Sequence, residues 1–109
     1  MKFKERLATN YIYVVLKNLD NKSAHQLFVE ARRKGEFDTG YHLILHNDGN
    51  IENDRNIDCV AQWNFENADC SIYILADVYN GRLSDAQRIR VREISSRHPN
   101  AEVRKVVKE

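Results

Sequence analysis

The sequence contains no apolar run that could cross a membrane as a helix. Residues 11–16 form an apolar run of only six residues, whereas a membrane-spanning helix needs about 20. Residues 1–6 lack the apolar stretch and the small-residue cleavage site of a signal peptide. We therefore expect a protein that acts in the cytoplasm and has no membrane partner.

Cysteine and glycine are also scarce. Cys59 and Cys70 are the two cysteines, and in a reducing cytosol we expect two free, half-buried thiols; a disulfide between them is the alternative. They lack the Cys-x-x-Cys spacing of common metal and redox motifs. The sequence also has no phosphate-binding loop and no glycine-rich dinucleotide fingerprint, which argues against those enzyme classes.

The composition is that of an ordinary globular protein. A chain of 109 residues with 42% hydrophobic and 30% charged residues predicts a single domain over residues 1–109. The net charge of +1 conceals a segregation of charge. Residues 47–69 hold six carboxylates and one arginine, whereas residues 88–109 hold seven lysines or arginines and three glutamates. This pattern can steer a partner of opposite charge, and the alternative is that both segments are ordinary solvated faces.

Three apolar segments predict strands at residues 11–16, 71–76 and 101–107, because β-branched and aromatic residues dominate the first two. Between them, residues 39–55 contain a strand, a tight turn and a second short strand. Asp48-Gly49 at the turn favours a type I′ hairpin, which needs positive φ at both residues.

Two helices are predicted from their end signals. Ser23 is an N-cap residue for the first helix, and Gly35 lies where a C-terminal cap belongs. The second helix begins at the capping box formed by Ser84 and Gln87, runs to about residue 97, and is expected to turn Ile89 inwards. The resulting order, β-α-β-β-β-α-β, predicts an α/β fold with a mixed central β-sheet flanked by helices.

The order of residues in the hairpin segment resembles a known family signature. Gly40-Tyr41-His42 is followed by aliphatic residues, then by Asp48-Gly49, a β-branched residue and Arg55. This order resembles the signature of the zinc N-acetylmuramoyl-L-alanine amidases, which include the amidase-type phage lysozymes and the related peptidoglycan-recognition domains. The similarity extends over nearly the whole chain, although its other matches gain force only from their order and spacing.

The resemblance implies a zinc ion held by two histidines and a cysteine or aspartate, and this chain departs from that pattern. The first histidine would fall at Val15 or Leu16, and the second ligand at Gln62 or Trp63. The last ligands would lie around or beyond Val106, where no histidine, cysteine or aspartate occurs. Zinc needs about three protein ligands in a catalytic site. We therefore expect a truncated relative that has lost its zinc ligands, a pseudoenzyme with no cofactor and no catalytic residue.

Other metal arrangements are weaker. Tyr41 matches the tyrosine that assists the zinc-bound water in active relatives, but without a metal we expect it to pack on a strand. We expect His42 to be a structural histidine that donates to a neighbouring backbone group. His42 and His46 are four residues apart on one strand, about 13 Å, which is too far for one ion. A rearranged site that joins Cys59 or Cys70 to His46 is left open.

We therefore expect a small protein, of phage origin, that binds and inhibits or modulates a bacterial protein inside the cell. RNA polymerase and components of defence systems are candidate targets, because some amidase-type phage lysozymes restrain RNA polymerase through surface outside the zinc cleft. The candidate binding residues are Tyr41, Asp54, Asp58, Trp63, Phe65, Arg88 and Arg92.

Three alternatives remain at this stage. The chain could be a residual zinc amidase acting on peptidoglycan, or a non-catalytic module that binds muropeptides. Arg88 and Arg92 could instead grip the phosphates of a nucleic acid, but the near-neutral total charge and the acidic middle of the chain argue against that role. A homodimer is also left open.

Overall fold

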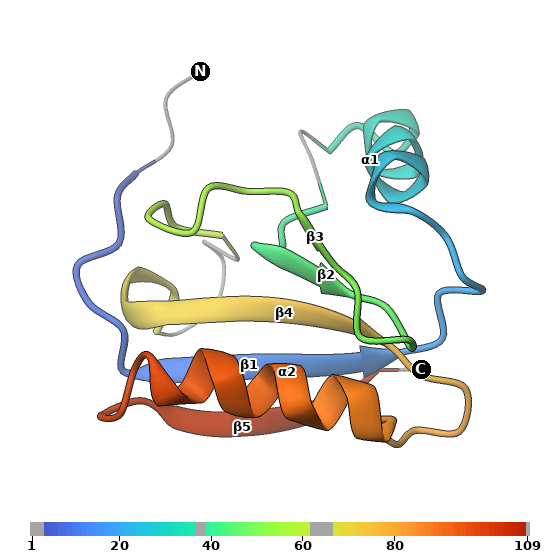
Figure 1. The fold of residues 1–109 in the computed structure, drawn as a ribbon. Coiled ribbons are helices and arrows are strands. Elements are labelled where there is room, and N and C mark those ends of the chain that lie inside the picture. The colour runs from blue at the N-terminus through green and yellow to red at the C-terminus, as the bar shows by residue number, and fades with distance from the viewer. Residues whose placement is uncertain (1–3, 37–38, 62–66, 109) are drawn as a thin grey trace.

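The computed structural model describes residues 4–36, 39–61 and 67–108, which form a five-stranded sheet with a helix on each face (Figure 1). The predicted order of elements and the α/β class are confirmed. The elements are β1 (Tyr11–Lys17), α1 (Ala24–Arg33), β2 (Leu43–Leu45), β3 (Ile51–Asn53), the short 3-10 helix η1 (Ala68–Cys70), β4 (Ser71–Asp77), α2 (Asp85–Ser96) and β5 (Glu102–Val107).

The strands lie in the order β3-β2-β4-β1-β5. β1 pairs in parallel with both β4 and β5, and β4 pairs in parallel with β2, so that only β3 runs antiparallel to its neighbour. β1 and β4 occupy the centre, which explains why they are the most apolar segments of the sequence: strands covered on both faces are buried throughout.

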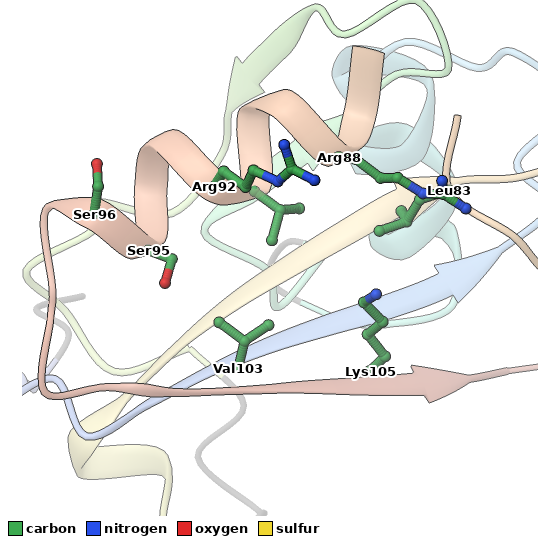
Figure 2. Close-up of a pocket in the computed structure, with 8 residues that line it drawn as sticks. Leu83, Arg88, Arg92, Ser95, Ser96, Val103 and Lys105 are labelled. Atoms are coloured by element: carbon green, nitrogen blue, oxygen red, sulfur yellow. The ribbon is translucent and has the colours of Figure 1, made fainter. Parts of the chain in front are cut away.

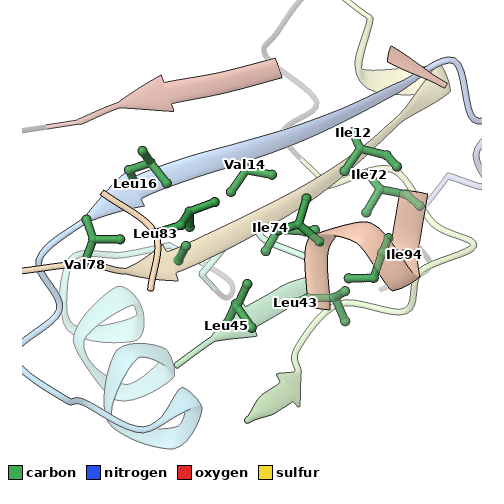
Figure 3. Close-up of a cluster of buried hydrophobic side chains, with 12 residues drawn as sticks. Ile12, Val14, Leu16, Leu43, Leu45, Ile72, Ile74, Val78, Leu83 and Ile94 are labelled. Atoms are coloured by element: carbon green, nitrogen blue, oxygen red, sulfur yellow. The ribbon is translucent and has the colours of Figure 1, made fainter. Parts of the chain in front are cut away.

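Alternating side chains divide the core between the two faces of the sheet. Under α2 lies a cluster that draws on β1, β2, β4 and α2 and includes Ile12, Ile74 and Val91 (Figure 3). On the opposite face, Val15, Ile44 and Leu75 belong to a second cluster, against which α1 places Leu27. Residues at even and odd positions of β1 therefore serve different cores.

Both predicted helix starts are confirmed. The hydroxyls of Ser23 and Ser84 each accept a hydrogen bond from the backbone N–H three residues further on. In return, the backbone N–H of each serine donates to the side-chain oxygen of Gln26 or Gln87. Gly35 follows the end of α1 with a φ of 86°, as expected of a C-terminal glycine. The inward position expected for Ile89 is wrong: this side chain is 55% exposed, because Val91 and Ile94 supply the buried face of α2.

The hairpin between β2 and β3 is confirmed, but its predicted turn type is wrong. Gly49 has a φ of 93°, whereas Asp48 does not have a positive φ. The N–H of Gly49 donates to the carbonyl of His46 at 2.9 Å, and the N–H of His46 donates to the carbonyl of Asn50 at 2.8 Å. This is a three-residue loop with a glycine bulge, a geometry that needs positive φ at the glycine alone.

No helix within the described ranges has the length and the apolar character to span a bilayer.

Candidate functional site

The carboxyl end of β1 is where the resemblance would place the first zinc-binding histidine. Val15 and Leu16 occupy it, and they are 7% and 5% exposed. Val15 belongs to the cluster on the α1 face and Leu16 to the cluster under α2. Neither side chain has a lone pair to offer a metal, and both are committed to packing. The residues present here do not fit a zinc ligand set.

His42 is fully buried just before β2, and both of its ring nitrogens have partners in the fold. Its Nδ1 accepts a hydrogen bond from the backbone N–H of Tyr73 at 2.9 Å. That bond leaves the proton on Nε2, which donates to the carbonyl of Cys59 at 2.6 Å. The expectation of a structural histidine that donates to a backbone carbonyl is confirmed.

Tyr41 lies beside His42 and is 8% exposed, in the same cluster as Val15 and Tyr73. Burial raises the pKa of its hydroxyl, and the negative charge of Glu36 adds to the effect. A tyrosine with a raised pKa is less able to share or lose its proton near neutral pH. Its surroundings are those of a core residue.

Asp54 and Asp58 lie in the loop that follows β3. The hydroxyl of Thr39 donates to the carboxylate of Asp54, which ties this loop to the segment before Tyr41. Asp58 is exposed. Between them, Arg55 is 6% exposed, and its guanidinium donates to the carbonyls of Val60 at 2.8 Å and Ala61 at 3.2 Å. The arginine of the signature segment thus holds the loop in shape.

Arg88 and Arg92 lie on the other side of the molecule. They project from α2 along the rim of a groove of about 570 Å³ between α2 and β5 (Figure 2). The sheet and its two cores separate them from Tyr41, so the candidate residues do not form one site. Trp63 and Phe65, like Gln62, lie outside the described residues.

Metal-binding side chains do not gather among the residues that the structure describes. No group of three or more His, Cys, Asp or Glu side chains that could hold an ion occurs there. His46, considered for a rearranged site, instead contacts the carboxylate of Glu52 at 2.5 Å. Cys59 and Cys70 are free, half-buried thiols.

The face of the sheet that carries Val15 also carries a row of rings, which we call the tyrosine row: Tyr11, Tyr13 and Tyr73. The rings of Tyr13 and Tyr73 stack with centroids 5.0 Å apart and planes 8° apart. The guanidinium of Arg104 lies 4.3 Å from the centroid of the Tyr11 ring and donates to the hydroxyl of Tyr13 at 3.2 Å. Arg104 also pairs with the carboxylate of Glu102, and Tyr11 and Tyr13 are half-buried, so the row presents partly exposed rings beside an ion pair.

Two buried polar side chains, Asp77 and Gln87, anchor the carboxyl end of β4, and neither buried role was predicted from the sequence. Asp77 is fully buried, and its carboxylate accepts the N–H groups of Leu19 at 2.8 Å and Asn21 at 3.0 Å. Gln87 is also fully buried, and its amide donates to the carbonyls of Leu45 and Asp77. A lone aspartate at the end of an apolar strand was the available signal for the first anchor.

Comparison with solved structures identifies the fold. The endolysin N-acetylmuramoyl-L-alanine amidase LysCS from Clostridium intestinale URNW superposes with a TM-score of 0.76 at 13% identity, over 96% of this chain and 73% of the amidase. The amidase LysC from the same organism gives 0.68 at 12% identity, over 96% and 78%. The PGRP-Hd of Alvinella pompejana gives 0.74 at 18% identity, over 95% and 75%.

No protein-family model and no curated protein matches the sequence. At these identities the structural likeness shows the fold alone: this chain has the mixed-sheet fold of amidases and of a PGRP. Its chemistry depends on its own residues.

Proposed function

We propose that this chain is a non-catalytic protein of amidase fold that acts by binding a bacterial protein. The proposal rests on one observation: the side chains at the positions that the resemblance assigns to the zinc site are packed in the core. Val15 is a buried core residue, and Tyr41 is a buried hydroxyl whose pKa is raised by burial. A metal-assisted amidase needs ligands and an activated water at this place, and these side chains supply neither.

The target we propose is a protein of a bacterial host whose activity is inhibited or modulated by the contact. RNA polymerase and defence-system components are candidates, and a phage-encoded protein acting in the host cytoplasm would meet either. The segregation of charge supports binding of a specific partner, since complementary fields set both the orientation and the rate of encounter.

Affinity capture with the tagged full chain from bacterial lysate tests this proposal. We expect one dominant protein partner in quantitative mass spectrometry, lost either in Trp63→Ala or in Arg88→Glu/Arg92→Glu. Arg33→Glu, an exposed charge reversal at the end of α1, is the matched control and should keep the partner. Retention of wall fragments without any protein partner would contradict the proposal.

The tyrosine row favours a second candidate function, the binding of muropeptides without cleavage. Partly exposed rings suit the faces of sugars, and a ligand carboxylate would compete with Glu102 for the guanidinium of Arg104. Calorimetric titration with a purified muropeptide tests it. Binding that is lost in Arg104→Ala and kept in Arg33→Glu would support a wall-binding role, and the absence of heat with the unaltered chain would exclude it.

A further inference from the structure

The groove between α2 and β5 has an apolar floor and a basic rim. Leu83, Val91 and Val103 line its floor. Arg88 and Arg92 project from α2, and Lys105 rises from β5 towards them (Figure 2). α2 lies against the inner strands and leaves β5 largely uncovered, and five of the six β5 residues are exposed.

The cations of this rim are available to a partner. Arg88 is 3.7 Å from Asp85, and both side chains are more than half exposed, so that this pair contributes little. Within the described residues, Arg92 and Lys105 have no carboxylate partner. Three positive charges around an apolar floor select a ligand that combines carboxylates with aliphatic side chains.

The outer edge of β5 is open as well. The N–H of Glu102 donates to the carbonyl of Asn10 and that of Lys108 to the carbonyl of Leu16, so the even-numbered residues turn their backbone groups towards β1. Because backbone groups alternate along a strand, Val103, Lys105 and Val107 turn theirs outwards. β5 ends the strand order, so these groups have no strand partner among the described residues.

The side chains of the same three residues lie on the α2 face, because Val103 pairs in register with Ile12 of the α2-side cluster. The groove and the open edge are therefore continuous. A strand added to β5 would place every second side chain in the groove, between the rim cations.

A second copy of this chain is a poor occupant. Antiparallel pairing of β5 with β5 through the outward groups of Val103, Lys105 and Val107 would set Lys105 of one copy directly opposite Lys105 of the other, and like charges directly opposite are destabilising. The other open edge, β3, has three residues, and its only carboxylate, Glu52, already contacts Ala24 and His46. The occupant must come from elsewhere.

We propose that β5 and the α2–β5 groove bind an extended acidic segment of the partner protein, which adds to the sheet as a sixth strand. This inference rests on the proposed binding function and names its surface. Main-chain hydrogen bonds to Val103, Lys105 and Val107 supply the pairing, aliphatic side chains enter the groove, and carboxylates meet the rim.

A defined peptide tests the surface without the natural partner. A fluorescein-labelled peptide that repeats Glu-Thr-Val-Thr places glutamate and valine on the same face of an added strand. It should bind the full chain in fluorescence anisotropy at least about tenfold tighter than a peptide that repeats Lys-Thr-Val-Thr. In amide hydrogen exchange, it should protect Val103, Lys105 and Val107. Equal affinity for the two peptides, or tighter binding of a single-stranded oligonucleotide, would overturn the proposal.

Two substitutions of Lys105 distinguish the contribution of main-chain pairing from that of the side-chain charge. Lys105→Pro removes an outward N–H while sparing the bonds to β1, and Lys105→Ala keeps that N–H. We expect Lys105→Ala to weaken binding of the Glu-Thr-Val-Thr peptide about threefold and Lys105→Pro about tenfold or more. Arg33→Glu should leave the affinity unchanged. Equal effects of the two Lys105 variants would overturn strand addition.

The two proposals fail in different ways. If a bacterial protein is captured equally well by Lys105→Pro and by the unaltered chain, the binding function stands and this surface is wrong. If no bacterial protein is captured and the peptide still protects β5, the surface stands and the binding function is wrong.

Discussion

His42 and Tyr73 exchange two hydrogen bonds, one of which uses a side chain in place of a backbone carbonyl. The N–H of His42 donates to the carbonyl of Tyr73 at 3.0 Å, and the N–H of Tyr73 donates to His42 Nδ1 at 2.9 Å. The imidazole thus extends the pairing of β2 with β4 beyond Leu43, where β2 begins. Its other nitrogen reaches Cys59 and holds the loop after β3.

His42→Phe should therefore destabilise the protein strongly. The ring would still fill the space, but the N–H of Tyr73 and the carbonyl of Cys59 would lose their partners in the interior. An unsatisfied buried group costs about 1–3 kcal/mol, so we expect a loss of about 2–4 kcal/mol in the free energy of unfolding, measured by urea denaturation. His25→Phe, on the exposed side of α1, is the control and should change stability by less than about 0.5 kcal/mol. Equal stability of the two variants would contradict the structural role of His42.

Asp77→Asn tests the anchor at the end of β4. The carboxylate accepts two backbone N–H groups from residues 19 and 21, and an amide has only one oxygen to offer them. We expect a loss of about 2–3 kcal/mol in the free energy of unfolding. Asp69→Asn, which removes an exposed pair with Lys4, should cost less than about 1 kcal/mol. If thermal unfolding ranks the two variants in the reverse order, the carboxylate of Asp77 does not anchor the end of β4.

Glu52 predicts a pH dependence of stability. The N–H of Ala24 donates to its carboxylate at 3.0 Å, and this bond, followed by that of His46, lowers the pKa of Glu52. A carboxyl whose pKa is lower in the folded state stabilises the protein above its ordinary pKa of about 4.3 and loses that contribution as the pH falls through the folded value. The unaltered protein should therefore lose more stability than Glu52→Gln between about pH 5 and about pH 3, as followed by thermal unfolding. Parallel curves would show that the two bonds do not act on the carboxylate.

Gly49 couples the hairpin to α2. A Cβ added at Gly49 would lie 3.1 Å from the Cβ of Ala86, and its φ of 93° disfavours any other residue. We expect Gly49→Ala to destabilise the protein by more than about 1 kcal/mol. A double-mutant cycle with Ala86→Gly separates the contact from the backbone strain. The double variant should lose less stability than the sum of the two single variants, by the amount due to the contact. Strict additivity would mean that backbone strain accounts for the whole effect.

The sequence predicted most of the fold because its local signals agree with its tertiary structure. Ser23 and Ser84 are cap residues in sequence and in structure, and the apolar runs at β1 and β4 are the central strands. Ile89 was misjudged because helical periodicity alone does not say which of two neighbouring stripes faces the sheet. The turn type was misjudged because Asp48-Gly49 fits more than one hairpin loop, and the actual loop length decides between them.

The candidate site was less predictable. Tyr41 and Arg88 both belong to motifs that chemistry can use, but only the sheet topology shows that they lie on opposite faces. The buried roles of Asp77 and Gln87 depend on backbone groups far away in sequence, which no local pattern reveals. The open edge of β5 likewise follows from the strand order, not from its composition.

Supplying zinc and a substrate tests most directly whether this protein of amidase fold is non-catalytic, as we propose. The full chain is incubated with equimolar zinc and a purified muropeptide, and mass spectrometry follows the bond between N-acetylmuramic acid and L-alanine. We predict that the muropeptide remains intact and that zinc is removed by dialysis. Release of the peptide from the sugar, stopped by a chelator, would contradict the account.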